Sequence, residues 1–117
     1  MKLSEIAEKL NLKNLTPESD PAQSADVTAG HVCDLLSDVL ANAPSGAVLV
    51  TIQVHLNVIA VCVHAGLSAV IFAAGMIPDD SVRQKAVEEG LTLYSTKEST
   101  FDIVGKLYSL GLRGTHA

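Results

Sequence analysis

The sequence predicts an α/β domain with an open, mostly parallel sheet of about four strands, helices packed on that sheet and a short N-terminal helix. First, aliphatic runs alternate with segments of helical spacing, which is the order of repeated strand and helix units. Second, residues 47–52 form an uncharged, β-rich run, as expected for a central parallel strand covered on both faces. Third, apolar residues make up 48% of the 117 residues and charged residues 18%, which favours one domain with its own core.

The first expected element is a short amphipathic helix at residues 3–12. Its apolar residues fall on one face, and Glu5 and Lys9 form an i,i+4 pair of opposite charge on the other. Residues 14–26 are rich in Pro, Ser and Asp, which favours an irregular connection. We therefore expect two parts: the N-terminal helix with its connection at residues 1–24, and the α/β domain at residues 25–117.

Four strand and helix units are expected after this connection. The strands begin near Ala25, Ala47, Leu67 and Leu91. The helices run from Leu35 to Asn42, from Asn57 to Ala65, from Pro78 to Gly90 and onward from Ser95. Glycines at 66 and 90 end two of these helices, because glycine accepts the left-handed conformation that commonly follows a last turn.

Polar side chains are expected to cap the helix starts. Asn57 is a favoured capping residue for the helix that it begins. Ser95 and Glu98 have the spacing of a capping box for the last helix. Asp79 and Asp80 suit the positive end of the helix before it.

Ligands of open α/β sheets bind beyond the carboxyl ends of the strands. Applied to the predicted strands, this rule gathers eight candidate ligand-binding residues along one edge: Gly30, His31, Gln53, His55, Asn57, Gly75, Ser95 and Thr96. Ser95 and Thr96 could hold a phosphate at a helix N-terminus, although capping is the commoner use of such residues. We expect a small anionic or nucleotide-like ligand at this edge.

Gln53, His55 and Asn57 form the most distinctive polar cluster, where a strand gives way to a helix. They could recognise a small polar ligand, or His55 could close the turn while Asn57 caps the helix. A small enzyme, or a subunit that completes one, could instead use His55 with Asn57. No carboxylate lies within ten residues of His55 in the sequence, so the enzyme alternative needs one that folding brings close.

Two pairs of histidine and cysteine, His31 with Cys33 and Cys62 with His64, together offer nitrogen and sulfur ligands that zinc accepts. One residue separates the partners of each pair, whereas zinc ligands are usually two to four residues apart. Cys62 and His64 would also diverge on a helix. We therefore predict no metal site, no cofactor and a structural role for the cysteines.

Composition argues against nucleic acid, membrane and secretory classes. The net charge of −5 has the wrong sign for neutralising phosphates along a strand, and an aromatic share of 3% leaves few surfaces on which bases could stack. The interval between Asp38 and Asp79 has no formal charge, but polar residues and glycines divide it into pieces too short to span a membrane. With no CxxC and no apolar leader, a cytoplasmic location is expected.

The segment at residues 27–112 resembles the DRTGG domain family, which is similar to the N-terminal domain of HPr kinase/phosphorylase. Five segments carry the resemblance, in this order: DLLS at 34–37, VTIQVHLNV at 50–58, AGLSAVI at 65–71, AVEEG at 86–90 and ST at 95–96. The resemblance implies an α/β regulatory or oligomerising module, often attached to a catalytic partner or to nucleotide-sensing CBS modules. The chain also looks like small stand-alone versions associated with iron hydrogenase genes.

Two departures from the family limit what the resemblance implies. The usual Gly-Asp-Arg type turn is replaced by residues 53–57, so the role of its charged residues is not carried over. The phosphate loop of a kinase domain, GxxxxGK[ST], is absent from the chain, so a serine kinase activity is not expected.

These observations predict a non-catalytic regulatory or scaffolding module that senses a small ligand and associates with itself, most simply as a two-fold dimer, or with a protein partner. The predicted dimer contacts are the helix at residues 57–65 and the loop at residues 75–77, which lie in the charge-poor interval. The alternatives are an accessory protein for iron hydrogenase cluster assembly and the small enzyme described above.

Overall fold

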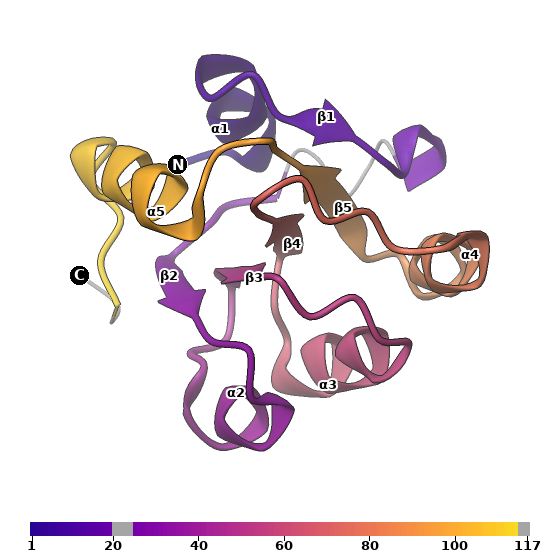
Figure 1. Ribbon diagram of the computed structural model, residues 1–117. Helices are drawn as coiled ribbons and strands as arrows, with labels where there is room; N and C mark the ends of the chain where they lie inside the picture. Colours follow the sequence, from indigo (N-terminus) through magenta and orange to yellow (C-terminus); the bar gives the residue numbers. More distant parts are fainter. Residues whose placement is uncertain (20–24, 115–117) are drawn as a thin grey trace.

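The structure is a computed structural model that describes residues 1–19 and 25–114. Within these residues the elements follow in the order α1 (Leu3–Lys9), β1 (Lys13–Asn14), β2 (Ala29–Val32), α2 (Leu36–Asn42), β3 (Ala47–Thr51), α3 (Asn57–Ala65), β4 (Ala69–Phe72), α4 (Asp80–Glu89), β5 (Thr92–Ser95) and α5 (Thr100–Ser109). The predicted alternation of strands and helices is confirmed, and the short N-terminal helix is present (Figure 1).

The sheet has five described strands in the order β1-β5-β4-β3-β2. Strands β2 to β5 run parallel, as predicted, and β1 pairs antiparallel with β5. Strand β1 was not predicted, because its two residues lie in a polar segment without the period of a strand. Its pairing continues beyond the strand, since Leu15 N–H donates to Leu93 O at 2.9 Å and Leu93 N–H donates to Thr16 Oγ1 at 3.0 Å.

The direction of the crossovers explains the layers in Figure 1. From β2 to β5, each strand lies next to the one before it, and the order always advances toward the same edge of the sheet. Because the crossovers are right-handed, this single direction places α2, α3 and α4 on one face. The opposite face would be bare, but α1 and α5 cover it. Leu3 and Ile6 of α1 have no exposed surface, so this helix supplies part of the core.

Two apolar cores result, one on each face of the sheet. The first joins residues of α2, α3 and α4 to side chains such as Leu49 and Phe72, and the second joins α1 and α5 to Val48, Ile71 and Tyr94. Strands β3, β4 and β5 are buried along their whole length, which explains why their sequences lack the alternation of a half-exposed strand.

The predicted ends of α3 and α4 are confirmed. Gly66 and Gly90 follow the two helices with φ of 72° each, in the left-handed region. Asp79 caps α4 by accepting hydrogen bonds from the backbone N–H groups of Ser81 and Val82.

Two predicted caps are wrong. Asn57 is the first residue of α3 rather than its cap, and the residue before it, Leu56, makes no side-chain capping bond. Ser95 belongs to β5, because its register with Phe72 keeps it in the sheet. Helix α5 is instead capped by Ser99, whose Oγ accepts from Asp102 N–H at 3.1 Å, so Ser95 and Glu98 form no capping box.

Two other expectations need correction. The strand expected from Ala25 begins at Ala29, after an isolated bridge between Lys2 and Asp26. Val58, in the helix predicted as a dimer contact, is fully buried in the core, so it cannot touch a second copy. Among the described residues, no helix has both the length and the apolar character needed to cross a membrane.

Candidate anion-binding site

Two loops at the carboxyl edge of the sheet are bonded to each other. Ala74 N–H, just after β4, donates to Glu98 O at 2.7 Å, and Gly75 N–H donates to Thr96 O at 2.9 Å. Ala74 and Gly75 both have positive φ, 57° and 73°. The left-handed conformation costs a residue with a Cβ about 1–2 kcal/mol, so the loop holds Ala74 in a strained conformation.

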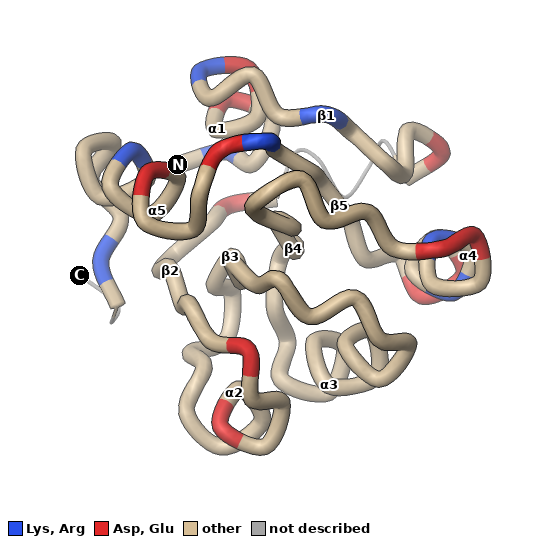
Figure 2. Tube along the Cα trace, viewed as in Figure 1, with Lys and Arg blue, Asp and Glu red and all other residues tan. Residues whose placement is uncertain are grey.

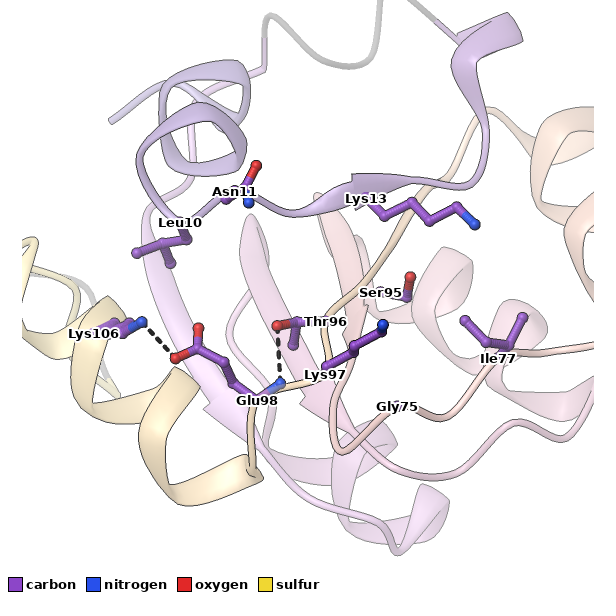
Figure 3. A pocket seen from close by; sticks show the side chains of 10 residues that line it. All are labelled: Leu10, Asn11, Lys13, Gly75, Ile77, Ser95, Thr96, Lys97, Glu98 and Lys106. Atoms are coloured by element: carbon purple, nitrogen blue, oxygen red, sulfur yellow. Dashed lines mark hydrogen bonds and ion pairs between the residues drawn. The ribbon is translucent and has the colours of Figure 1, made fainter.

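A cavity of about 570 Å³ lies beside these loops. Its floor is formed by Gly75, Ser95 and Thr96, and its walls come from the turn after α1, from β1, from the loop before α5 and from Lys106 of α5 (Figure 3). Three segments distant in sequence therefore build it, and the antiparallel pairing of β1 with β5 is what brings the N-terminal segment to the site.

The cavity is basic in a protein whose net charge is −5. Its lining includes three of the chain's eight Lys and Arg residues, Lys13, Lys97 and Lys106, against a single acid, Glu98. Lys106 forms an ion pair with Glu98. Lys13 and Lys97 make no ion pair among the described residues, and Figure 3 shows their side chains on either side of Ser95. Two ammonium groups are thus left for an anion.

Two hydroxyl groups, those of Ser95 and Thr96, also line the cavity. Thr96 Oγ1 accepts a hydrogen bond from Glu98 N–H at 3.2 Å, which fixes the first turn of the loop, and its own O–H is still a donor. Ser95 is 5% exposed at the end of β5. Two ammonium groups and two hydroxyls around one cavity can bind a phosphate or a carboxylate by charge-assisted hydrogen bonds.

Three of the eight predicted site residues, Gly75, Ser95 and Thr96, line this cavity. Gly30 and His31 do not, because they lie within β2 rather than beyond its carboxyl end, at the opposite end of the sheet. The carboxyl-edge rule was applied to a strand placed too early in the sequence.

Gln53, His55 and Asn57 lie in the connection from β3 to α3, away from the cavity. The backbone N–H of each of these three residues donates to a side chain two residues earlier: Gln53 N–H to Thr51 Oγ1 at 3.0 Å, His55 N–H to Gln53 Oε1 at 3.2 Å, and Asn57 N–H to His55 Nδ1 at 3.1 Å. These side chains therefore shape the loop, and the expected turn-closing role of His55 is what the geometry shows.

The enzyme alternative needed a carboxylate beside His55. In the part of the chain that the structure describes, the only hydrogen bond found for the His55 side chain is the one that Nδ1 accepts from Asn57. No ion pair links it to an acidic residue there, so the geometry provides no dyad on which an acid and base mechanism could be built.

Sequence analysis missed the three lysines. Lys13 lies between the predicted first helix and the predicted irregular connection, Lys97 lies inside the predicted capping box, and Lys106 lies in the predicted last helix. One signal was available: Lys97 directly follows Ser95 and Thr96 at the end of a predicted strand. No such signal marked Lys13, since only the fifth strand places it there.

Comparison with known proteins finds similarity in structure rather than in sequence. No protein-family model matches the chain, and no curated protein matches it in sequence. Among solved structures, the fold is similar to the CBS and DRTGG domains of the regulatory region of Clostridium perfringens pyrophosphatase, complexed with its activator, diadenosine tetraphosphate, with a TM-score of 0.72 and 12% identity.

This similarity covers 89% of the chain and 44% of that regulatory region, so the chain spans less than half of the structure that it matches. At this identity the comparison establishes the fold and supports the DRTGG-like architecture that the sequence resembled. The similarity to HPr kinase/phosphorylase stays a prediction.

Proposed function

We propose that this chain is a non-catalytic regulatory module that senses a small phosphate-bearing, nucleotide-like ligand in the cavity between β1 and the β5–α5 loop. The observation that carries the proposal is the pair of lysines without an ion pair among the described residues, Lys13 and Lys97, on either side of Ser95 in a cavity that Thr96 also lines. In an acidic protein, this concentration of positive charge in a cavity is the feature that selects for an anion (Figure 2).

The size of the cavity supports a ligand larger than one phosphate. Ligand pockets commonly measure about 300–1,000 Å³, and this cavity measures about 570 Å³. Leu10 and Ile77 add apolar surface to its rim, on which a base or sugar could rest. The similar fold of a regulatory region whose activator is a dinucleoside tetraphosphate supports the same ligand class.

Electrostatics favours a polyphosphate over a neutral nucleoside. A unit charge 4 Å from an ammonium group gains about 1 kcal/mol in water and about 4 kcal/mol at the lower dielectric of a protein surface. Two ammonium groups acting on two or more phosphate charges therefore supply most of the binding free energy, and the base adds less.

Calorimetric titration with ATP and with adenosine tests the proposal. We expect ATP to bind and adenosine to bind at least about tenfold more weakly, because charge-assisted hydrogen bonds are worth about 1.5–3 kcal/mol each. Lys97→Ala should weaken ATP binding by about tenfold. Lys85→Ala is the matched control, since Lys85 lies on α4 in ion pairs with Glu88 and Glu89, and it should change nothing. Equal binding of ATP by both variants would refute the site.

Self-association is the second part of the proposal. Met76 and Ile77 of the predicted loop contact are exposed, and the exposed apolar surface also supports a contact that was not predicted. Phe101 on α5 is 86% exposed, and Tyr108 and Val32 beside it are 59% and 49% exposed. The Arg113 guanidinium stacks on the Tyr108 ring, with its carbon 3.6 Å from the ring centroid, and thereby orders this face. A two-fold axis would let Phe101 of each copy cover the Val32 and Tyr108 of the other.

Light scattering distinguishes the two contacts. Phe101→Glu should convert a dimer to a monomer, because a charge would have to be buried in the contact. Val63→Glu, on the exposed side of α3, tests the helix predicted from the sequence and should leave the dimer intact. A wild-type monomer at all accessible concentrations would refute self-association, and a dimer lost only in Val63→Glu would return the contact to α3.

A further inference from the structure

Three side chains that commonly bind transition metals meet at the other end of the carboxyl edge. His31 lies on β2, Cys33 directly follows this strand, and Asp38 lies in the first turn of α2. One ligand atom from each residue lies within 4.8 Å of the other two. None of the three lines the basic cavity, so this cluster is separate from the proposed ligand site.

The contact between His31 and Asp38 has the spacing of two metal ligands. His31 Nε2 and Asp38 Oδ2 are 3.4 Å apart, longer than the usual hydrogen bond of about 2.7–3.2 Å. Two such ligands on a tetrahedral zinc ion, with bonds of about 2.0–2.1 Å, would be about 3.3–3.4 Å apart. The same Nε2 atom is buried and has no hydrogen-bond partner among the described residues.

Neighbouring groups hold the other two ligands. Asn42 Nδ2 donates to Asp38 Oδ1 at 2.7 Å, which leaves Oδ2 directed to His31. Leu35 N–H donates to Cys33 Sγ at 3.4 Å, and the thiol donates to Leu35 O at 3.5 Å, so the backbone of Leu35 fixes the position of the sulfur. Supporting bonds of this kind orient and tune the ligands of metal centres.

The donor set selects the class of metal. Calcium and magnesium prefer oxygen ligands throughout, whereas an imidazole nitrogen, a thiolate and a carboxylate suit zinc and similar divalent ions. A thiolate and a carboxylate together carry two negative charges, which balance a divalent cation. The His31 and Asp38 side chains are 17% and 39% exposed, so an ion can reach the cluster from solvent.

We infer that His31, Cys33 and Asp38 form a zinc-binding site with three protein ligands, in which the fourth position is open to water or to a group from a partner. This inference is independent of the proposed ligand cavity. It differs from the expectation of no metal because the third ligand, Asp38, comes from a helix five residues after Cys33, a spacing that sequence analysis did not consider.

Titration of the metal-free protein with zinc and with cobalt tests the inference. We expect one zinc ion to bind per chain, and cobalt to give the absorption band of a cobalt–thiolate bond. Cys33→Ser, which keeps the size of the side chain, should abolish this band, and His31→Gln should weaken zinc binding at least about tenfold. Asn42→Ala, which frees the Asp38 carboxylate, should weaken it by about 10–100-fold.

Cys62→Ala and His64→Gln are the matched controls, because they remove the chain's other described cysteine and a second histidine outside the cluster. Both should bind zinc like the wild type. Circular dichroism checks that each variant folds, and in the unaltered chain zinc should protect Cys33 from alkylation by iodoacetamide. Failure to bind zinc at micromolar protein, or a cobalt band that survives Cys33→Ser, would overturn the inference and leave an ordinary pair of His31 and Asp38.

Discussion

The two ends of the carboxyl edge belong to one sheet, but they carry side chains of opposite charge. Above β5 and β1, Lys13 and Lys97 line the cavity that we propose as an anion site. Beside β2, the charged residues at and just before α2 are acidic (Figure 2). One of them, Asp38, lies close to His31 and Cys33. The strands at the two ends also differ, since β2 reads Ala-Gly-His-Val, β1 reads Lys-Asn and β5 reads Thr-Leu-Tyr-Ser. Polar residues on the outer strands and in the adjoining loops therefore decide what each end can bind, and the aliphatic strands β3 and β4 hold the two ends in place.

The largest expected effect comes from removing both lysines of the basic end. Lys13→Ala with Lys97→Ala should weaken ATP binding by about 100-fold, since each loses a charge-assisted bond worth about one factor of ten. Zinc binding by the same double variant should be unchanged. Parallel calorimetry with the two ligands checks both statements, and a loss of both affinities would mean that the two ends are not independent.

Salt should separate the two ends in the wild type. Raising the ionic strength from about 0.05 M to about 0.5 M should weaken ATP binding by about tenfold, because exposed ammonium groups are strongly screened. Zinc held by direct bonds to sulfur and nitrogen should respond far less. Titrations at the two ionic strengths in a non-coordinating buffer measure this, and equal salt sensitivity would contradict the distinction.

Asp79 caps α4 and directly follows the loop that contributes Gly75 and Ile77 to the basic cavity. Hydrogen bonds from the Ser81 hydroxyl, and then from the Val82 and Ser81 N–H groups, hold the pKa of Asp79 below its ordinary value. Because the folded pKa is lowered, this stabilisation is complete above the unfolded pKa and is lost as the pH falls through the folded one. Asp79→Ala should lower the melting temperature by several degrees at pH 7, with a smaller difference at pH 3.

In the same experiment Asp79→Asn is the control, because asparagine caps a helix without a charge. Its melting temperature at pH 7 should lie between those of the wild type and Asp79→Ala. An Asp79→Ala difference that stays constant with pH would show that the carboxylate charge contributes nothing.

The smallest expected effect concerns the strained residue in the basic end. Ala74→Gly should raise the free energy of unfolding by about 0.5 kcal/mol, because relief of left-handed strain outweighs the added freedom of the unfolded chain. Urea unfolding measures the change. Gly75→Ala is the opposite variant and should destabilise, although an added Cβ there would meet no atom within 4 Å. Destabilisation by Ala74→Gly would show that this residue carries no strain.

The sequence predicted the sheet better than the site, for a physical reason. Strands such as Ala47–Thr51 are buried on both faces, so their composition alone identifies them. Helix ends at Gly66 and Asp79 followed from local chemistry. Strand β1 has no such signature, because its conformation depends on its pairing with Tyr94 and Ser95.

The candidate sites depend on contacts between distant segments. Gly75, Ser95 and Thr96 were predicted because they follow strands, while Lys13 reaches them only through β1. His31 was selected for the anion site by a misplaced strand end. The predicted link to iron hydrogenase cluster assembly stays a prediction.

The central claim, that the basic end binds a phosphate-bearing ligand, is tested most directly by following the backbone amide NMR signals during titration with ATP. The account predicts shifts gathered at Lys13, Gly75 and residues 95–98, with residues 31–38 unchanged. Shifts confined to residues 31–38, or none at millimolar ATP, would contradict it.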